Sequence, residues 1–228
     1  MKYYVSNPVL DAQINEIRQK IRLSMNGIVS DQMTQSGIVY KKNYGVSFPR
    51  LKEIAASYES NHDLAQRLWS LQIRETMILA TLLEPIDSFT MELAEKWSDS
   101  FNQIEIIELS CMNLFRNLTF ASQLFAKWIL SENNWKVITG FILAARIYEK
   151  LNAGEVNILI QKAFESSQTD DFHLYKSIAF CLCRLCRKDK QIAASILAGI
   201  NQFSISTSVS QQFISTEVKQ EILFLGII

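Results

Sequence analysis

The sequence predicts an all-α protein in which pairs of helices repeat along the chain. Its 228 residues include only 7 Gly and 3 Pro, which sheet proteins use freely at their turns. Apolar residues recur at spacings of three and four, the period of a helix with one buried face. Similar segments surround Trp69, Trp97 and Trp128, which lie roughly 30 residues apart, the period of an α-solenoid. We therefore expect a solenoid of stacked two-helix units.

Helix-capping residues mark the starts of several helices. Ser47 precedes Pro49, and Asn61, Ser88 and Thr119 each precede an apolar-periodic segment. Side chains of these types accept hydrogen bonds from the free N–H groups of a first helical turn, and proline is tolerated there. The first helices of three pairs are therefore expected just after Asn61, Ser88 and Thr119.

The remaining helices follow from periodicity alone. We expect the second helix of each pair over 72–84, 103–116, 134–151 and 171–187. Further helices are expected over 6–25, 47–58, 154–167 and 189–200. The Ser/Thr-rich stretch after Asn201 predicts a loop before a final helix.

The chain is expected to form one domain over 1–228. It would comprise N-terminal helices over 1–60, helical-pair repeats over 61–200, and a loop with a terminal helix over 201–228. One two-helix unit cannot bury its own apolar face, so neighbouring units bury it together. The tryptophans of the repeated segments are expected to pack between helices for this reason.

Charge is balanced overall but unevenly distributed. The formal net charge is zero, which argues against a chain that coats nucleic acid by bulk charge alone. Residues 1–52 carry eight Lys/Arg, Lys2 among them, against three acidic residues, whereas 84–108 carry seven acidic residues and a single lysine. A second basic cluster contains Arg184, Arg187, Lys188 and Lys190. One part of the surface could therefore contact phosphate.

No pattern predicts a metal, a cofactor or a membrane span. Cys181, Cys183 and Cys186 lie close together, but His62 and His173 lack ligand spacing, so inert thiols in a reducing cytosol are favoured. The N-terminus lacks an apolar run of signal-peptide length, and the apolar end ILFLGII is too short to cross a bilayer. We expect a cytoplasmic protein.

The stretch at 44–83, YGVSFPRLKEIAASYESNHDLAQRLWSLQIRETMILATLL, resembles the DNA alkylation repair (AlkD-like) family. The resemblance continues to about residue 190, through FHLYKSIAFCLCR at 172–184. The residues that carry it are Gly45, Val46, Pro49, Leu51, Ile54, Ala55, Leu64, Ala65, Leu68, Trp69 and Glu75.

This resemblance implies a HEAT-like repeat solenoid, a right-handed α-α superhelix whose concave face binds DNA. The second helix of each pair lines that face. Active members of the family hydrolyse the glycosidic bond of cationic N3- and N7-alkylated purines, using an aspartate, two tryptophans and an arginine. A carboxylate suits this chemistry because it stabilises the oxocarbenium-like sugar that the departing base leaves.

Several positions depart from the active pattern of the family. Glu108 falls on the catalytic aspartate, and Ile104 falls on the neighbouring tryptophan. Phe180 falls on the second tryptophan. At the arginine position, just beyond Trp135, Lys136 is the only nearby cation.

Helical periodicity separates the two carboxylates of NQIEIIE. At about 100° per residue, Glu108 is expected inside an apolar arc with Ile107, and Glu105 is expected at the edge of that arc. An acid among apolar neighbours indicates either a functional group in a groove or an ion pair, here with Arg146 or Arg116. Arg146 would correspondingly contact phosphate or neutralise Glu108.

The sequence thus predicts a DNA-binding protein with little or no base excision. The expected DNA contacts are Lys136, Arg146, Lys176, Arg184, Arg187 and Lys188. One alternative is an active alkylpurine glycosylase in which Glu108 is the catalytic carboxylate and an aromatic residue, Phe180, Trp135 or Trp97, contacts the sugar. Another is a helical-repeat scaffold that binds a protein partner, which zero net charge suits.

Overall fold

The computed structural model describes residues 6–227, apart from the side chains of residues 204 and 205. Lys2 of the basic N-terminal segment lies outside this range. Every regular element among the described residues is a helix, and none of these residues forms a strand. No helix in the described part of the chain combines the length and apolarity needed to cross a membrane.

The described residues divide into two compact units. Unit 1 comprises 6–94 and 102–118, and unit 2 comprises 95–101 and 119–227. Helix α6 (Met91–Ser98) contributes residues to both units. The expectation of one domain over 1–228 stays a prediction.

Unit 1 is organised around α5, whose side chains are buried on nearly every side. Its apolar sequence RETMILATLL packs against α3, α4 and α7. Asn61 caps α4, its side chain accepting a hydrogen bond from the N–H of Leu64 at 2.9 Å. The helices of this unit are α1 (Pro8–Leu23), α2 (Gly27–Gln35), α3 (Phe48–Ala55), α4 (His62–Ser70), α5 (Arg74–Leu83) and α7 (Ile104–Asn113), with short 3₁₀ helices at Ile86–Ser88 and Phe115–Asn117.

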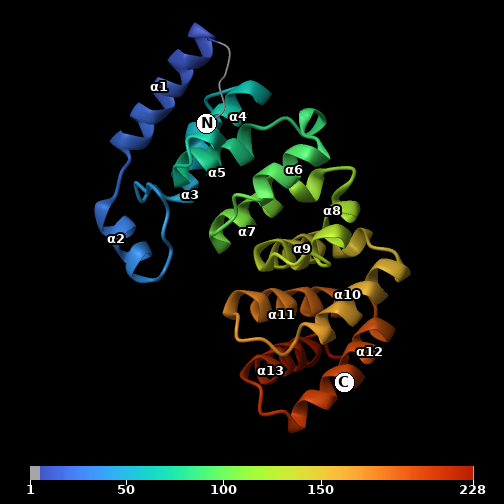
Figure 1. Cartoon of the computed structure of the whole chain (residues 1–228). Helices are drawn as coiled ribbons and strands as arrows, with labels where there is room; N and C mark the ends of the chain where they lie inside the picture. The colour runs from blue at the N-terminus through green and yellow to red at the C-terminus, as the bar shows by residue number, and fades with distance from the viewer. Residues whose placement is uncertain (1–5, 228) are drawn as a thin grey trace. The chain divides into compact units, whose positions relative to one another are not determined.

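In unit 2 the second helices of successive pairs pack side by side. Helix α11 (Phe172–Cys186) lies between α9 (Asn134–Arg146) and α13 (Val209–Phe224), as Figure 1 shows. The partner helices are α8 (Ala121–Trp128), α10 (Ala153–Glu165) and α12 (Lys190–Ile200), and short 3₁₀ helices lie at Tyr148–Lys150 and Asn201–Ile205. Helices α9, α11 and α13 therefore form one layer within unit 2.

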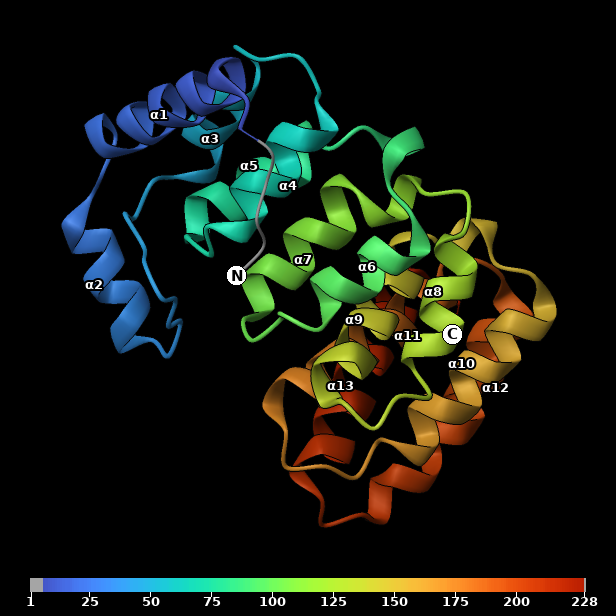
Figure 2. The ribbon, with the colours of Figure 1, turned by 45° about the horizontal axis from the view of Figure 1, so that its top comes forward.

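The predicted helices are confirmed, but α2 was not predicted. Each expected range contains a helix, with ends shifted by a few residues. Asn26 caps α2, but α2 buries none of its residues. The sequence of α2 therefore lacks the apolar period by which a helix is recognised. Figure 2 shows α2 at the end of α1, apart from α4, α5 and α7.

The predicted packing role of the three tryptophans is also confirmed. Trp69, Trp97 and Trp128 are 6%, 1% and 0% exposed. The indole N–H of Trp128 donates a hydrogen bond of 2.9 Å to Oε1 of Glu95, so its single polar atom is satisfied while the ring is buried.

The backbone geometry at Gly45 and Val46 explains why a glycine and a valine stand near the start of the stretch 44–83. Gly45 has φ +68°, and a Cβ there would lie 2.1 Å from the carbonyl oxygen of Asn26. The backbone N–H groups of Tyr44 and Val46 both donate to Oε1 of Glu75, at 3.1 and 3.3 Å. The glycine lets the chain pass α2 closely, and the buried Glu75 holds the turn on α5.

We expect Gly45→Ala to lower the free energy of unfolding by about 1–3 kcal/mol, because the new methyl group would overlap backbone atoms at a strained φ. Urea denaturation followed by circular dichroism would measure the loss. Gly37→Ala is the control, since Gly37 also has a positive φ but a Cβ there would have no atom within 4 Å. Equal losses in both variants would show that φ alone, and not the contact with Asn26, is responsible.

Candidate nucleic-acid interface

An alternating row of aromatic and basic side chains runs along α11. Phe172, Lys176, Phe180 and Arg184 follow one another at intervals of four residues, so they lie on one face of the helix. Phe172 and Lys176 are exposed, and Phe180 and Arg184 are half-buried. We call these four residues the α11 row.

Two arginines share the ring of Phe180. The guanidinium carbon of Arg184 lies 5.3 Å from the ring centroid, and that of Arg146, on α9, lies 5.5 Å from it. Neither arginine forms an ion pair with any described residue, and Nε of Arg146 is buried without a hydrogen-bond partner among them. Two uncompensated cations against one ring form a site of positive potential with an aromatic surface.

The first turn of α11 carries a cluster of rings that sequence reasoning missed. The ammonium group of Lys176 lies 4.5 Å from the centroid of Phe172. The ring of Phe172 contacts those of His173 and Tyr175, at 5.7 and 5.5 Å between centroids. Trp135 on α9 contacts His173, so the rings continue onto the neighbouring helix. The density of rings in FHLYKSIAF was the signal that could have found this cluster.

Three of the predicted DNA-contacting cations are engaged with groups of the protein itself. Lys136 has a side chain only 15% exposed and pairs with Glu95 at 2.9 Å and Asp99 at 2.7 Å. Arg187 pairs with Glu221, and Nζ of Lys188 donates to the backbone carbonyl of Glu149 at 2.7 Å. Contact with phosphate would require these cations to give up or share existing partners.

The carboxylate of Glu95 collects three donors within unit 2. Burial alone would raise the pKa of Glu95, but hydrogen bonds from Lys136, Lys127 and Trp128 outweigh burial and hold the pKa below its ordinary value. Lys136 therefore has a structural partner whose charge it stabilises.

Lys136→Gln is expected to raise the pKa of Glu95 and to flatten the dependence of stability on acid pH. A carboxyl pKa that is lowered in the folded state stabilises the fold above the ordinary pKa, and this contribution is lost as the pH falls through the folded-state value. The variant should thus lose Tm near neutral pH and little near about pH 3. Lys96→Gln, at an exposed position on the helix that carries Glu95, is the control; parallel profiles of Tm against pH for the two variants would contradict the assignment.

The environments of Glu105 and Glu108 are the reverse of those expected. Glu105 forms a two-pronged ion pair with Arg74, at 2.7 and 2.6 Å, and accepts a hydrogen bond from the hydroxyl of Tyr40. Glu108 is exposed and forms no ion pair with Arg116 or with any other described residue of unit 1, and its expected pairing with Arg146 of unit 2 stays a prediction. The buried arc of α7 is centred on Ile106 and Ile107, which turns Glu108 towards solvent.

Phe180, Arg146 and Arg184 are thus the predicted site residues that the structure brings together. Lys176 lies one turn away on the same face of α11. The described residues contain no group of three His, Cys, Asp or Glu side chains that could hold a metal ion. Burial raises the pKa of the Cys186 thiol to about 12, so this thiol is protonated near neutral pH.

Paired helices whose second members pack side by side define a helical-repeat protein. One solved structure has the same fold, with a TM-score of 0.80 and 13% sequence identity, covering 93% of this chain and 94% of the other. It is described as "A new family of proteins related to the HEAT-like repeat DNA glycosylases with affinity for branched DNA structures".

The chain belongs to the DNA alkylation repair enzyme family, whose model matches residues 17–199. The match spans both units, and it includes α9, α11 and the whole α11 row. No curated protein matches the sequence.

Proposed function

We propose that the protein binds DNA through α9 and α11, with the pair of arginines on Phe180 at the centre of the contact. The observation that carries this proposal is the absence of an ion pair for Arg146 and Arg184 among the described residues, although both guanidinium groups lie against one ring. Arginine is well suited to phosphate because its planar donors match two phosphate oxygens at once.

Local charge, and not net charge, supports this contact. The whole chain is neutral, and several cations are already neutralised by carboxylates, so a positive site must be local. Family membership supports DNA as the polyanion, and the resemblance assigns DNA contacts to second helices such as α9 and α11. The solved structure of the same fold has been described as having affinity for branched DNA, which makes branched DNA a ligand to test.

Base excision is proposed to be weak or absent for two reasons. Glu108, at the position of the catalytic aspartate, is exposed, and solvent screens the field of an exposed carboxylate at a developing cation. Phe180, at the position of the second tryptophan, already carries two guanidinium groups. A cationic alkylated base stacked on that ring would meet two like charges.

The test is a titration of fluorescent duplex and branched DNA at several salt concentrations. The logarithm of the binding constant should fall linearly with the logarithm of the salt concentration. The slope should correspond to about two to four phosphate contacts, at about 0.9 per phosphate. No binding to either DNA at the lowest salt concentration would overturn the proposal and favour a protein-binding scaffold.

Release of N7-methylguanine from alkylated duplex DNA tests the glycosylase alternative in parallel. We expect the wild-type protein and Glu108→Gln to release base at the spontaneous rate. Release by the wild type that the variant loses would establish Glu108 as the catalytic carboxylate and contradict the expectation of weak excision.

A further inference from the structure

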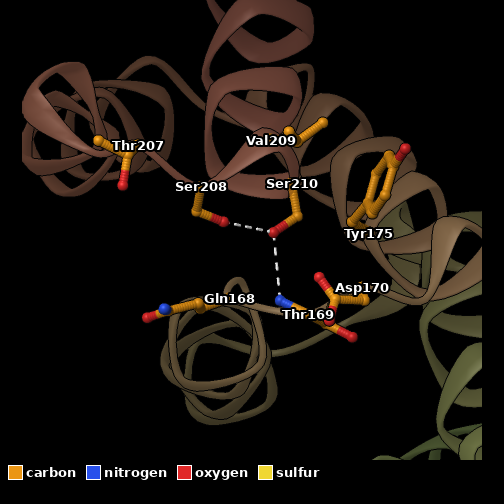
Figure 3. Close-up of a pocket in the computed structure, with 8 residues that line it drawn as sticks. All are labelled: Gln168, Thr169, Asp170, Tyr175, Thr207, Ser208, Val209 and Ser210. Atoms are coloured by element: carbon orange, nitrogen blue, oxygen red, sulfur yellow. Dashed lines mark hydrogen bonds between the residues drawn. The ribbon is translucent and has the colours of Figure 1, made fainter.

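A polar pocket opens beside the first turns of α11 and α13. Its volume is about 580 Å³, within the range of pockets that hold small organic ligands. The ring of Tyr175 forms one wall, and polar side chains from the segments before α11 and α13 form the others (Figure 3). The lining includes Gln168, Asp170, Tyr175, Thr207, Ser208 and Ser210.

Hydrogen bonds hold the walls of this pocket together without a ligand. Oγ of Ser210 accepts from the backbone N–H of Thr169 at 3.1 Å and lies 2.8 Å from Oγ of Ser208, as the dashed lines in Figure 3 mark. The side-chain amide of Gln211 donates to the hydroxyl of Ser167 at 2.9 Å. The start of α13 is thereby tied to the turn before α11, so a ligand would enter a pocket that is already formed.

Other polar groups of the pocket have no partner within the described part of the chain. The amide of Gln168, the carboxylate of Asp170 and the hydroxyls of Thr207 and Tyr175 form no hydrogen bond or ion pair there. These groups supply acceptors and donors around a flat aromatic wall. A planar ligand with N–H donors on its edge matches this arrangement.

The aromatic wall of the pocket is continuous with the α11 row. The ring of Tyr175 lies 5.5 Å from that of Phe172 and 5.2 Å from that of Phe213 on α13. Phe172 is 50% exposed and has the ammonium group of Lys176 beside it. A chain of nucleotides lying along α11 would therefore meet an exposed ring with a cation at the edge of the pocket, the combination that binds unpaired nucleotides.

Charge decides which part of a nucleotide can enter. Asp170 repels a phosphate group from the pocket, whereas Lys176 attracts one outside it. A carboxylate accepts hydrogen bonds from the amino group of cytosine, adenine or guanine, and thymine has no such group.

We propose that this pocket receives an unpaired nucleobase that carries an exocyclic amino group. The base stacks on Tyr175, Asp170 accepts from its amino group, and Lys176 contacts the adjoining phosphate. This inference rests on the proposed DNA binding and adds a preference for an unpaired base to it.

The test compares a blunt DNA duplex with the same duplex carrying a single unpaired 3′ nucleotide. With the wild-type protein, an unpaired cytosine, adenine or guanine should tighten binding by about tenfold over the blunt duplex, in line with the contribution of one stacked base. An unpaired thymine should give a smaller gain, and an abasic nucleotide should give none.

Two variants separate stacking from hydrogen bonding. Tyr175→Leu should abolish the gain for every base. Asp170→Asn should move the gain for amino-bearing bases towards that for thymine, because the amide oxygen still accepts a hydrogen bond but carries no charge. Asp170 is exposed, so its variant is expected to fold, and Asp31→Asn on α2 is the matched control for the change in charge. Binding of the blunt duplex should be the same in Asp170→Asn and Asp31→Asn.

Failure of this inference is distinguishable from failure of DNA binding. If the blunt duplex binds but all unpaired nucleotides give the same affinity as the blunt end, the pocket inference is overturned and the proposed function stands. Calorimetry would also show whether free deoxycytidine binds to the wild type. If it binds while the unpaired nucleotide has no effect on DNA affinity, the pocket inference is overturned in favour of a nucleoside site. Loss of all DNA binding would overturn both proposals.

Discussion

Arg74→Met is expected to destabilise unit 1 by about 3–5 kcal/mol, the loss typical of breaking a buried ion pair from one side. Arg74 is 5% exposed and is held by four contacts. Its Nε and Nη2 donate to the two oxygens of Glu105, and its Nη1 donates to the backbone carbonyl of Val46 at 2.9 Å and to Glu75 at 3.0 Å. Methionine fills similar space but carries no charge. Glu75 is fully buried, and Arg74 is the one cation among the described residues that pairs with it, so the variant leaves this carboxylate unpaired.

The loss would be measured as the shift in the urea midpoint, with the far-ultraviolet circular dichroism spectrum as a check of the fold. Arg50→Met is the matched control, because Arg50 pairs with Glu53 at the surface, where such a pair contributes about 1 kcal/mol or less. Equal midpoints for the two variants would show that the buried contacts of Arg74 are no more stabilising than an exposed ion pair. Glu105→Gln should fall between them, since the amide keeps the contact but not the charge.

The double variant Arg146→Gln/Arg184→Gln is expected to weaken DNA binding about 10- to 100-fold at low salt and to reduce the salt slope by about two. Each arginine is proposed to neutralise one phosphate, and neither has a carboxylate of the described residues to satisfy its charge otherwise. Fluorescence anisotropy over a series of salt concentrations measures both quantities.

Arg187→Gln is the matched control for this loss of charge. Arg187 lies one turn after Arg184, and Glu221 already pairs with it, so its removal should change affinity and slope much less. A slope that stays the same in the double variant would place the phosphate contacts elsewhere and contradict the proposed function. The stability of the variants should match that of the wild type, because both arginines are only partly buried.

Most helices of this protein were predictable because their signals are local. Asn61 caps α4 through a hydrogen bond from the N–H of Leu64, three positions away, as predicted. The other expected caps were wrong: Ser47 forms no capping hydrogen bond, Thr90 and not Ser88 caps α6, and Phe120 and not Thr119 precedes α8. Helix α2 was not predictable in this way. It buries none of its residues, so no apolar period marks it.

The candidate interface was predictable only in part. Phe180, Arg184 and Arg146 could be selected one at a time from the resemblance and from their charge, but α9 and α11 had to pack before both arginines could meet the same ring. Lys136 shows the converse. The sequence predicted a DNA contact for Lys136, whereas folding pairs Lys136 with Glu95 and Asp99, which lie much earlier in the chain.

By itself the sequence determined the all-helical class, the repeated pairs and the family, because caps, periods and motifs depend on neighbours along the chain. Only the tertiary structure decided which charges remain uncompensated and which face of an apolar helix is buried. In α7 the isoleucines surround both glutamates, and helical periodicity wrongly predicted that Glu108, and not Glu105, faces the other helices. Packing against α5 decided it: Arg74 engages Glu105, and Glu108 is left in solvent.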